Sequence, residues 1–167
     1  SGNEAAIGGG IYADTSAMVF SGRIIANVAT TTGGGIHALG GSTIDLSDAS
    51  IGLESVGGTD RGNRATAGSG GGIYLAGSTL DAVNSSFRNN RAAAGDVAAI
   101  AALAGSGVAI DAPFGTCNPL TRLCSSLRDN TATTSLPANG NGGAIYVNAS
   151  TLDLAHSYLS GNAAQRG

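Results

Sequence analysis

The feature that most constrains this 167-residue chain is a short pattern that returns along its whole length. In four of the five copies glycines lead into an isoleucine strand, whereas Ala-rich residues precede Ile100 in the other, and an Asn followed two residues later by Ala closes each repeat. Glycines directly precede Ile11, Ile36 and Ile73, and Gly-Gly-Ala precedes Ile145. Self-similarity at a period of a few tens of residues indicates a solenoid, in which each repeat packs only on its neighbours.

The asparagines measure the length of each repeat. They are Asn3, Asn27, Asn63, Asn90, Asn130 and Asn162, and the steps between them are 24, 36, 27, 40 and 32 residues. We interpret the shortest step as a bare coil and the longer ones as coils that carry loops, which gives about five coils. Two inserts stand out, a Gly-rich one at 54–62 and another at 113–123.

Within a repeat, short runs alternate polar and apolar residues between Gly, Ser and Asn, as strands do and helices of ordinary length do not. The pattern predicts an all-β fold, a right-handed parallel β-helix (solenoid) with three short strands per coil. Residues 92–104 would also suit a short helix, but Gly95 and Gly105 bound them and Ile100 keeps the register, so we favour a coil. Residues 1–167 are expected to form a single segment. Its ends match in phase, so we expect an internal piece of a longer solenoid, contacting other segments or copies at its open ends.

Stacking coils about 4.8 Å apart places equivalent residues in columns. Three apolar columns are predicted to face inward. The first is Ile11, Ile36, Ile73 and Ile145; the second Ala17, Ile44, Leu80, Ile110 and Leu152; the third Ile24, Ile51, Phe87, Leu127 and Leu159. The six asparagines are predicted to form a structural ladder of side-chain amides along the axis.

Composition excludes several classes of function. The net charge is −3 and the chain has no lysine, so no basic patch for nucleic acid is expected. No apolar run approaches the roughly 18 residues of a membrane span, so we expect no direct membrane insertion of this segment. The glycine runs lead into strands and no Gly-Lys-Ser/Thr follows, which argues against a phosphate-binding loop, and no cofactor is expected.

The surface is expected to be that of an exported protein. Charged residues make up 11% of the chain, against about 25% in typical soluble domains. Cys117 and Cys124 bracket six residues, and we predict a disulfide that staples this loop, as exported proteins form and keep such bonds. Two buried free thiols are the alternative. A zinc site is disfavoured because no second Cys/His pair lies nearby.

Two further columns are candidates for chemistry. Tyr12, His37, Tyr74 and Tyr146 should point outward, where stacked rings either bind sugars or protect the strand face. Asp45, Asp81, Asp111 and Asp153 would stack as carboxylates able to share a proton or hold Ca²⁺. We favour the structural interpretation of both columns, because a catalytic site should break a repeat at one place. We therefore predict no catalytic residue and an isolated His156. Exposed ion pairs are predicted for Arg64, Arg88, Arg91 and Arg128.

At these motifs the sequence resembles the polymorphic outer-membrane protein repeat, which pairs Gly-Gly-x-Ile with Phe-x-x-Asn. The first half matches at Gly142-Gly143-Ala144-Ile145, and the second at Phe87-Arg88-Asn89-Asn90. Aliphatic residues replace Phe at Ile24, Leu127 and Leu159, three residues before their asparagines. The resemblance implies a bacterial exported β-helix, often a surface passenger or adhesin.

The function predicted from the sequence is a non-catalytic structural or adhesive segment of an exported bacterial surface protein. Its loops or repetitive face would bind a host or cell-surface protein or a glycan. One alternative is a carbohydrate-active β-helix that binds or cleaves polysaccharide. Another is a fibre subunit that assembles through its open ends.

Overall fold

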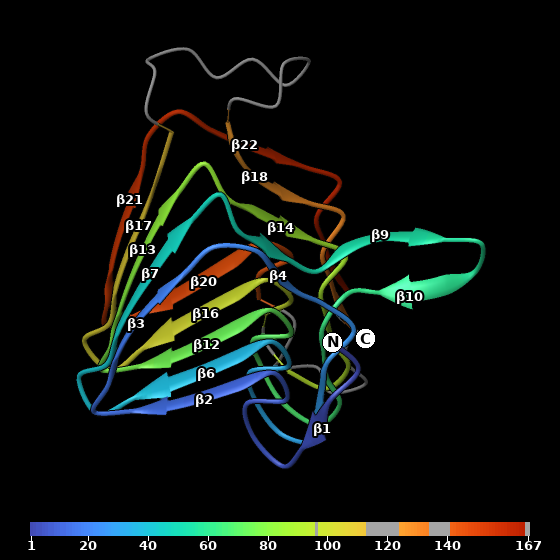
Figure 1. Cartoon of the computed structure of the whole chain (residues 1–167), viewed down its shortest axis with the longest axis horizontal. Coiled ribbons are helices and arrows are strands. Elements are labelled where there is room, and N and C mark those ends of the chain that lie inside the picture. The colour runs from blue at the N-terminus through green and yellow to red at the C-terminus, as the bar shows by residue number, and fades with distance from the viewer. Residues whose placement is uncertain (96, 113–123, 134–140, 166–167) are drawn as a thin grey trace.

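The computed structural model describes every residue except 96, 113–123, 134–140 and 166–167. The described chain is a right-handed parallel β-helix of about five coils, as predicted (Figure 1). Four parallel sheets run along the axis, and neighbouring strands in each sheet come from successive coils. Each turn of the chain visits the four sheets in the same order, so a residue lies directly above its equivalent one coil earlier.

The strands of the four sheets are short and in register. The first sheet contains β2 (Ile11–Asp14), β6 (Ile36–Leu39), β12 (Ile73–Ala76), β16 (Ile100–Leu103) and β20 (Ile145–Asn148). The second contains β3 (Ala17–Phe20), β7 (Thr43–Ser47), β13 (Thr79–Val83), β17 (Gly107–Asp111) and β21 (Thr151–Leu154). The third contains β4 (Arg23–Ile24), β8 (Ser50–Ile51), β14 (Ser86–Arg88), β18 (Ser125–Arg128) and β22 (Ser157–Ser160).

The fourth sheet is formed by the residues that follow each ladder asparagine. Each coil therefore has four strands rather than the three predicted. Its members are β1 (Glu4–Ala5), β5 (Val28–Ala29), β11 (Arg64–Ala65), β15 (Arg91–Ala92), β19 (Thr131–Thr133) and β23 (Ala163–Gln165). Ala29, Ala65, Ala92 and Ala132 are fully buried. Strands of two or three residues are too short for alternation to reveal them, and only the pairing between coils defines them.

The core is built from stacked aliphatic columns. The first predicted column is observed and includes Ile100. The third is observed as predicted, with Phe87 fully buried at its centre. These side chains form one continuous core along the axis, except Leu159 in the last coil, which is 45% exposed. Residues 97–112 continue the coil rather than form a helix, because β16 and β17 pair with strands on both sides.

The second predicted column was wrong at two positions. Met18, not Ala17, pairs with Ile44, and Val108, not Ile110, pairs with Leu80. Ile110 instead aligns with Ala82 in a second inward column of the same sheet. The sheet is five residues wide at β7, β13 and β17 and buries two columns rather than one. Alternation alone therefore left a register ambiguity of two residues.

Serine hydroxyls form further ladders at two corners. Between the first and second sheets, the backbone N–H of Ser78 donates to Ser106 Oγ, and that of Ser106 donates to Ser150 Oγ. Between the second and third sheets, the Ser85 N–H donates to Ser125 Oγ at 3.0 Å. These buried donors would otherwise lack partners where strand pairing stops. A Ser-Thr pair precedes three of the five strands of the second sheet, at Ser42, Ser78 and Ser150, and was the signal for the first corner in the sequence.

The predicted insert at 54–62 is an antiparallel hairpin that projects from the coil (Figure 1). It consists of β9 (Leu53–Val56) and β10 (Thr59–Arg61), joined at Gly57 and Gly58. Both glycines have positive φ, 58° and 79°, as the tight turns that suit twisted hairpins require. The predicted insert at 113–123 lies outside the described residues.

Candidate binding faces

The asparagine ladder holds successive coils at a fixed spacing, and this spacing sets the distances between side chains on every outer face. Each Asn donates both its backbone N–H and its side-chain Nδ2 to the Oδ1 of the Asn one coil further on, from Asn3 through Asn162. The second Nδ2 hydrogen of Asn63, Asn90 and Asn130 bonds a backbone carbonyl in the third sheet. Asn supplies one acceptor and two donors, which this corner uses in full. The ladder locks the spacing of the coils.

Glycine makes room for this ladder at the start of the first sheet. A Cβ at Gly35 or Gly72 would lie 3.2 Å from the amide of Asn63 or Asn90. The middle glycines, Gly34 and Gly71, are closer still to backbone atoms of neighbouring coils. The Gly-rich run and the Asn, far apart in each repeat, therefore meet in space.

The aromatic column is observed on the first sheet, but it is less open than predicted. Tyr12, His37 and Tyr74 stack in register, with ring centroids 5.6 and 4.9 Å apart. Ala101 interrupts the column before Tyr146. Tyr12 is 48% exposed, but His37 is only 7% exposed. His37 packs between two rings and its Nδ1 hydrogen-bonds Thr32 Oγ1 at 2.9 Å. The stack protects this strand face, and only Tyr12 offers a largely open ring.

Burial of His37 makes a pH-dependent contribution to stability. Desolvation lowers the pKa of His37 below 6.5, opposed by a hydrogen bond with Thr32. His37 therefore binds a proton more readily in the unfolded chain than in the folded chain. The free energy of unfolding should decrease as pH falls through and below 6.5. Replacing His37 with Tyr keeps a ring in the column and removes this titration. Urea unfolding at about pH 7.5 and about pH 5 should show a smaller loss for H37Y than for the parent. An equal loss in both proteins would contradict this assignment.

The aspartate column on the second sheet is broken. Asp45 and Asp81 pair in neighbouring coils, but their next equivalent is Ala109, and Asp153 follows one coil later. The prediction that Asp111 belongs to this column was wrong, because Asp111 aligns with Val83, two residues further along the strand. Gly107 and Ala109 leave a shallow depression of about 540 Å³ between the Thr and Asp side chains of β13 and β21. Among the described residues, no three His, Cys, Asp or Glu side chains gather closely enough to hold a metal ion.

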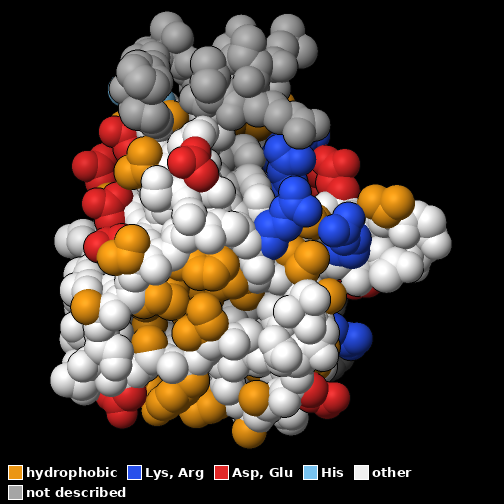
Figure 2. Space-filling view, in the orientation of Figure 1, with side chains coloured by type: hydrophobic (Ala, Val, Ile, Leu, Met, Phe, Trp, Pro, Cys, Tyr) orange, Lys and Arg blue, Asp and Glu red, His pale blue; other side chains and the backbone are white. Residues whose placement is uncertain are grey.

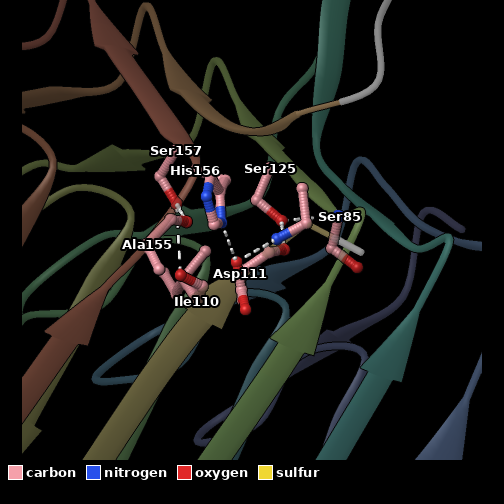
Figure 3. Close-up of polar contacts among 8 residues, drawn as sticks. Ser85, Ile110, Asp111, Ser125, Ala155, His156 and Ser157 are labelled. Atoms are coloured by element: carbon pink, nitrogen blue, oxygen red, sulfur yellow. Dashed lines mark hydrogen bonds and ion pairs between the residues drawn. The ribbon is translucent and has the colours of Figure 1, made fainter. Parts of the chain in front are cut away.

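Asp111 instead pairs with His156 (Figure 3). The prediction that His156 is isolated was therefore wrong. His156 Nδ1 lies 2.9 Å from Asp111 Oδ1, across the corner after the second sheet. This contact and the Ala112 N–H lower the pKa of Asp111. Nearby Ser125 and Ser157 donate their hydroxyls to backbone carbonyls of Asp111, Ala155 and Ile110 (Figure 3). Both serine hydroxyls therefore stabilise the backbone at this corner. Neither donates to His156, so the cluster is not a Ser-His-Asp triad.

A groove on the third sheet was missed by sequence reasoning. It holds about 300 Å³ and is lined by three arginines, Arg23, Arg88 and Arg128, together with serines and Tyr158. Two of the predicted ion pairs exist, Arg88 with Glu54 at 3.2 Å and Arg91 with Asp60 at 3.8 Å. The ion pairs predicted for Arg64 and Arg128 are absent from the described residues. Arg88 and Arg128 each follow the third apolar column in the sequence, but nothing in the sequence indicated the groove that they line with Arg23.

The described part of the predicted Cys loop is its second cysteine. Cys124 is buried and is not a free thiol. Cys117 lies outside the described residues, so the Cys117–Cys124 pairing stays a prediction.

One known protein family has a repeat that resembles part of this chain, and the matched residues fall at defined positions of the coil. Residues 125–148 match the Chlamydia polymorphic membrane protein (Chlamydia_PMP) repeat. The match begins in β18, includes the ladder residue Asn130 and ends with Gly142-Gly143-Ala144-Ile145 and β20. Both halves of the polymorphic membrane protein motif therefore occupy defined places, at the Asn corner and at the entry to the first sheet.

The matched polymorphic membrane protein repeat confirms the resemblance seen in the sequence, over one repeat. The other coils carry equivalent residues in the same register. No curated protein and no solved structure matches the chain significantly. The described residues include no helix capable of crossing a membrane.

Proposed function

We propose that this chain is a non-catalytic segment of an exported bacterial surface protein and that its rigid β-helix presents the β9–β10 hairpin to a binding partner. The match of residues 125–148 to a repeat of membrane proteins, within a uniform β-helix, is the observation that carries the surface assignment. The described residues repeat without a convergent set of acids, bases and nucleophiles, which supports a presenting role over catalysis.

The hairpin suits contact with a partner because it leaves the coil and is exposed. Every residue of β9 and β10 except Leu53 and Arg61 is exposed, and Val56 at its tip is 62% exposed. Its base is held by the ion pair of Glu54 with Arg88 and by Asn89, which donates to Ser55 Oγ and Asp60 Oδ1. Inserts in solenoids map to the binding face, and this one is braced at its base.

The surface location can be tested in the bacterium that encodes the chain. An antibody raised against the hairpin should label intact cells, because the proposed location places β9 and β10 outside the envelope. Labelling that appears only after permeabilisation would contradict the proposal.

The role of the hairpin can be tested by removing it without disturbing the coil. Deleting residues 53–61 joins Gly52 to Gly62 and shortens the Asn27–Asn63 step from 36 to 27 residues, the same as the Asn63–Asn90 step. The new junction Ile51-Gly52-Gly62-Asn63 is equivalent to Phe87-Arg88-Asn89-Asn90. The lost contacts lie at the surface, although Arg88 is only 18% exposed and Leu53 is half-buried, so the free energy of unfolding should change by about 1 kcal/mol.

The deletion should abolish binding of the labelled full chain to cultured epithelial cells, measured by flow cytometry. Circular dichroism melting of both proteins provides the control for folding. A deletion variant that melts like the parent and still binds cells equally well would refute presentation by the hairpin.

A further inference from the structure

The groove on the third sheet has a continuous polar floor that crosses all five coils. One outward column of this sheet runs through Arg23, Ser50, Ser86, Ser126 and Tyr158. Ser86 Oγ and Ser50 Oγ are 3.3 Å apart. The groove thus offers hydroxyls along its length, a guanidinium at one end and a phenol ring at the other. Its volume of about 300 Å³ lies at the small end of the range for small-molecule sites.

The neighbouring outward column brings two like charges together. Arg88 and Arg128 occupy equivalent positions in successive coils, and both line the groove. Like charges directly opposite each other on paired strands are unfavourable. Arg88 is partly compensated by Glu54, whereas Arg128 has no carboxylate partner among the described residues. The Nε atoms of both arginines are buried, and the part of the chain that the structure describes offers them no hydrogen-bond partner. A buried donor left unpaired carries a free-energy cost, which an added acceptor removes.

The remaining charges around the groove leave an excess of cations. Asp48 lines the groove, and its Oδ1 accepts a hydrogen bond from Asn84 Nδ2 at 2.5 Å. With Glu54 beside Arg88, two carboxylates face three guanidinium groups. Figure 2 shows basic side chains gathered beside the hairpin, with some acidic side chains next to them and others along the margin formed by the second sheet. This local excess arises in a chain whose net charge is −3.

We propose that this groove binds an acidic saccharide, whose carboxylate or sulfate groups pair with Arg88 and Arg128. The planar guanidinium matches both anions with two parallel hydrogen bonds. The serine column suits the hydroxyls of a sugar ring, and Tyr158 supplies an aromatic surface with a polar tip. An acidic peptide would also satisfy the arginines, and its main-chain amides would hydrogen-bond serine hydroxyls, so it is the competing occupant that the peptide probe below tests. The groove borders the base of the hairpin, since Leu53 lines it and Glu54 pairs with Arg88, but the inference does not require the hairpin to bind a partner.

Isothermal titration calorimetry on the full chain tests the proposal, with tetragalacturonate as the acidic probe. Its fully methyl-esterified form is the neutral control, because the two differ only in the charged groups. We expect tetragalacturonate to bind at least tenfold more tightly than the ester. Affinity should fall as salt is raised, since counter-ions screen the arginines. Equal binding of the two probes, or binding of neither the acidic probe nor a sulfated tetrasaccharide, would overturn the proposal.

Arg128→Gln is the test variant and Arg64→Gln the matched control. Arg64 is exposed on the fourth sheet and does not line the groove. R128Q should weaken tetragalacturonate binding at least tenfold, whereas R64Q should change it less than twofold. R128Q should also melt at the same or a higher temperature than the parent, because it removes like-charge repulsion. Unchanged affinity in R128Q would overturn the proposal. It would also be overturned if R128Q melted at a lower temperature than the parent and lost binding only because it was partly unfolded.

Two further probes separate the sources of the anion and the class of the occupant. A sulfated tetrasaccharide that binds and is lost in R128Q supports the same site with sulfate in place of carboxylate. Tetraglutamate is the peptide control. Binding of tetraglutamate as tightly as of the best saccharide would reject a saccharide as the occupant.

Discussion

Asn90→Ala is expected to lower the free energy of unfolding by about 2–4 kcal/mol, a large part of the 5–15 kcal/mol that stabilises a typical domain. Asn90 is fully buried at the centre of the ladder. Its Oδ1 accepts the backbone N–H of Asn63 at 3.1 Å, and its Nδ2 donates to Ile51 O at 2.8 Å and to Asn130 Oδ1 at 3.1 Å. Alanine leaves the buried Asn63 N–H without its acceptor. Urea unfolding followed by circular dichroism measures the loss.

The end of the ladder offers the matched control for Asn90. Asn162 is only half-buried and accepts from Asn130 without passing a bond to a further Asn. Asn162→Ala should therefore cost clearly less than Asn90→Ala. Equal losses at the two positions would show that the ladder adds little beyond local side-chain hydrogen bonds.

Gly34→Ala is expected to cost at least about 3 kcal/mol and to prevent folding if the coils cannot separate. A Cβ at Gly34 would lie 2.6 Å from the backbone nitrogen of Arg64 and would also contact the Gly71 carbonyl oxygen. Both obstacles are main-chain atoms of the next coil, so no change of rotamer relieves the overlap. The yield of folded protein and the urea midpoint measure this effect.

Gly107 provides the control, because its surroundings can accept a methyl group. A Cβ there would meet only Thr151 Oγ1 and Thr79 Cγ2, each at 3.5 Å, which is ordinary van der Waals contact. Gly107→Ala should be neutral or stabilise by up to about 1 kcal/mol, since it reduces the freedom of the unfolded chain. A loss at Gly107 comparable with that at Gly34 would contradict close coil approach as the reason for the glycine.

The parts predicted correctly are those that repeat at every coil. The first and third apolar columns follow from Ile73 and Phe87 and their equivalents, because one residue type at one phase defines a column. The predictions failed where two positions competed. Asp111 and Ile110 lie two residues from the places assigned to them, and strand alternation is equally satisfied by either register.

The repeat in the sequence determined that the chain winds into stacked parallel coils, because residues of one kind at one phase can bury their apolar surface only by lying over one another. The tertiary structure alone decided which residues of different coils share an outer face. Loops of unequal length separate Arg23, Arg88 and Arg128 along the chain, as they separate Asp111 from His156. Arg88 and Arg128 share one phase of the repeat, but only the packing of the coils forms the groove around them and sets Asp111 beside His156.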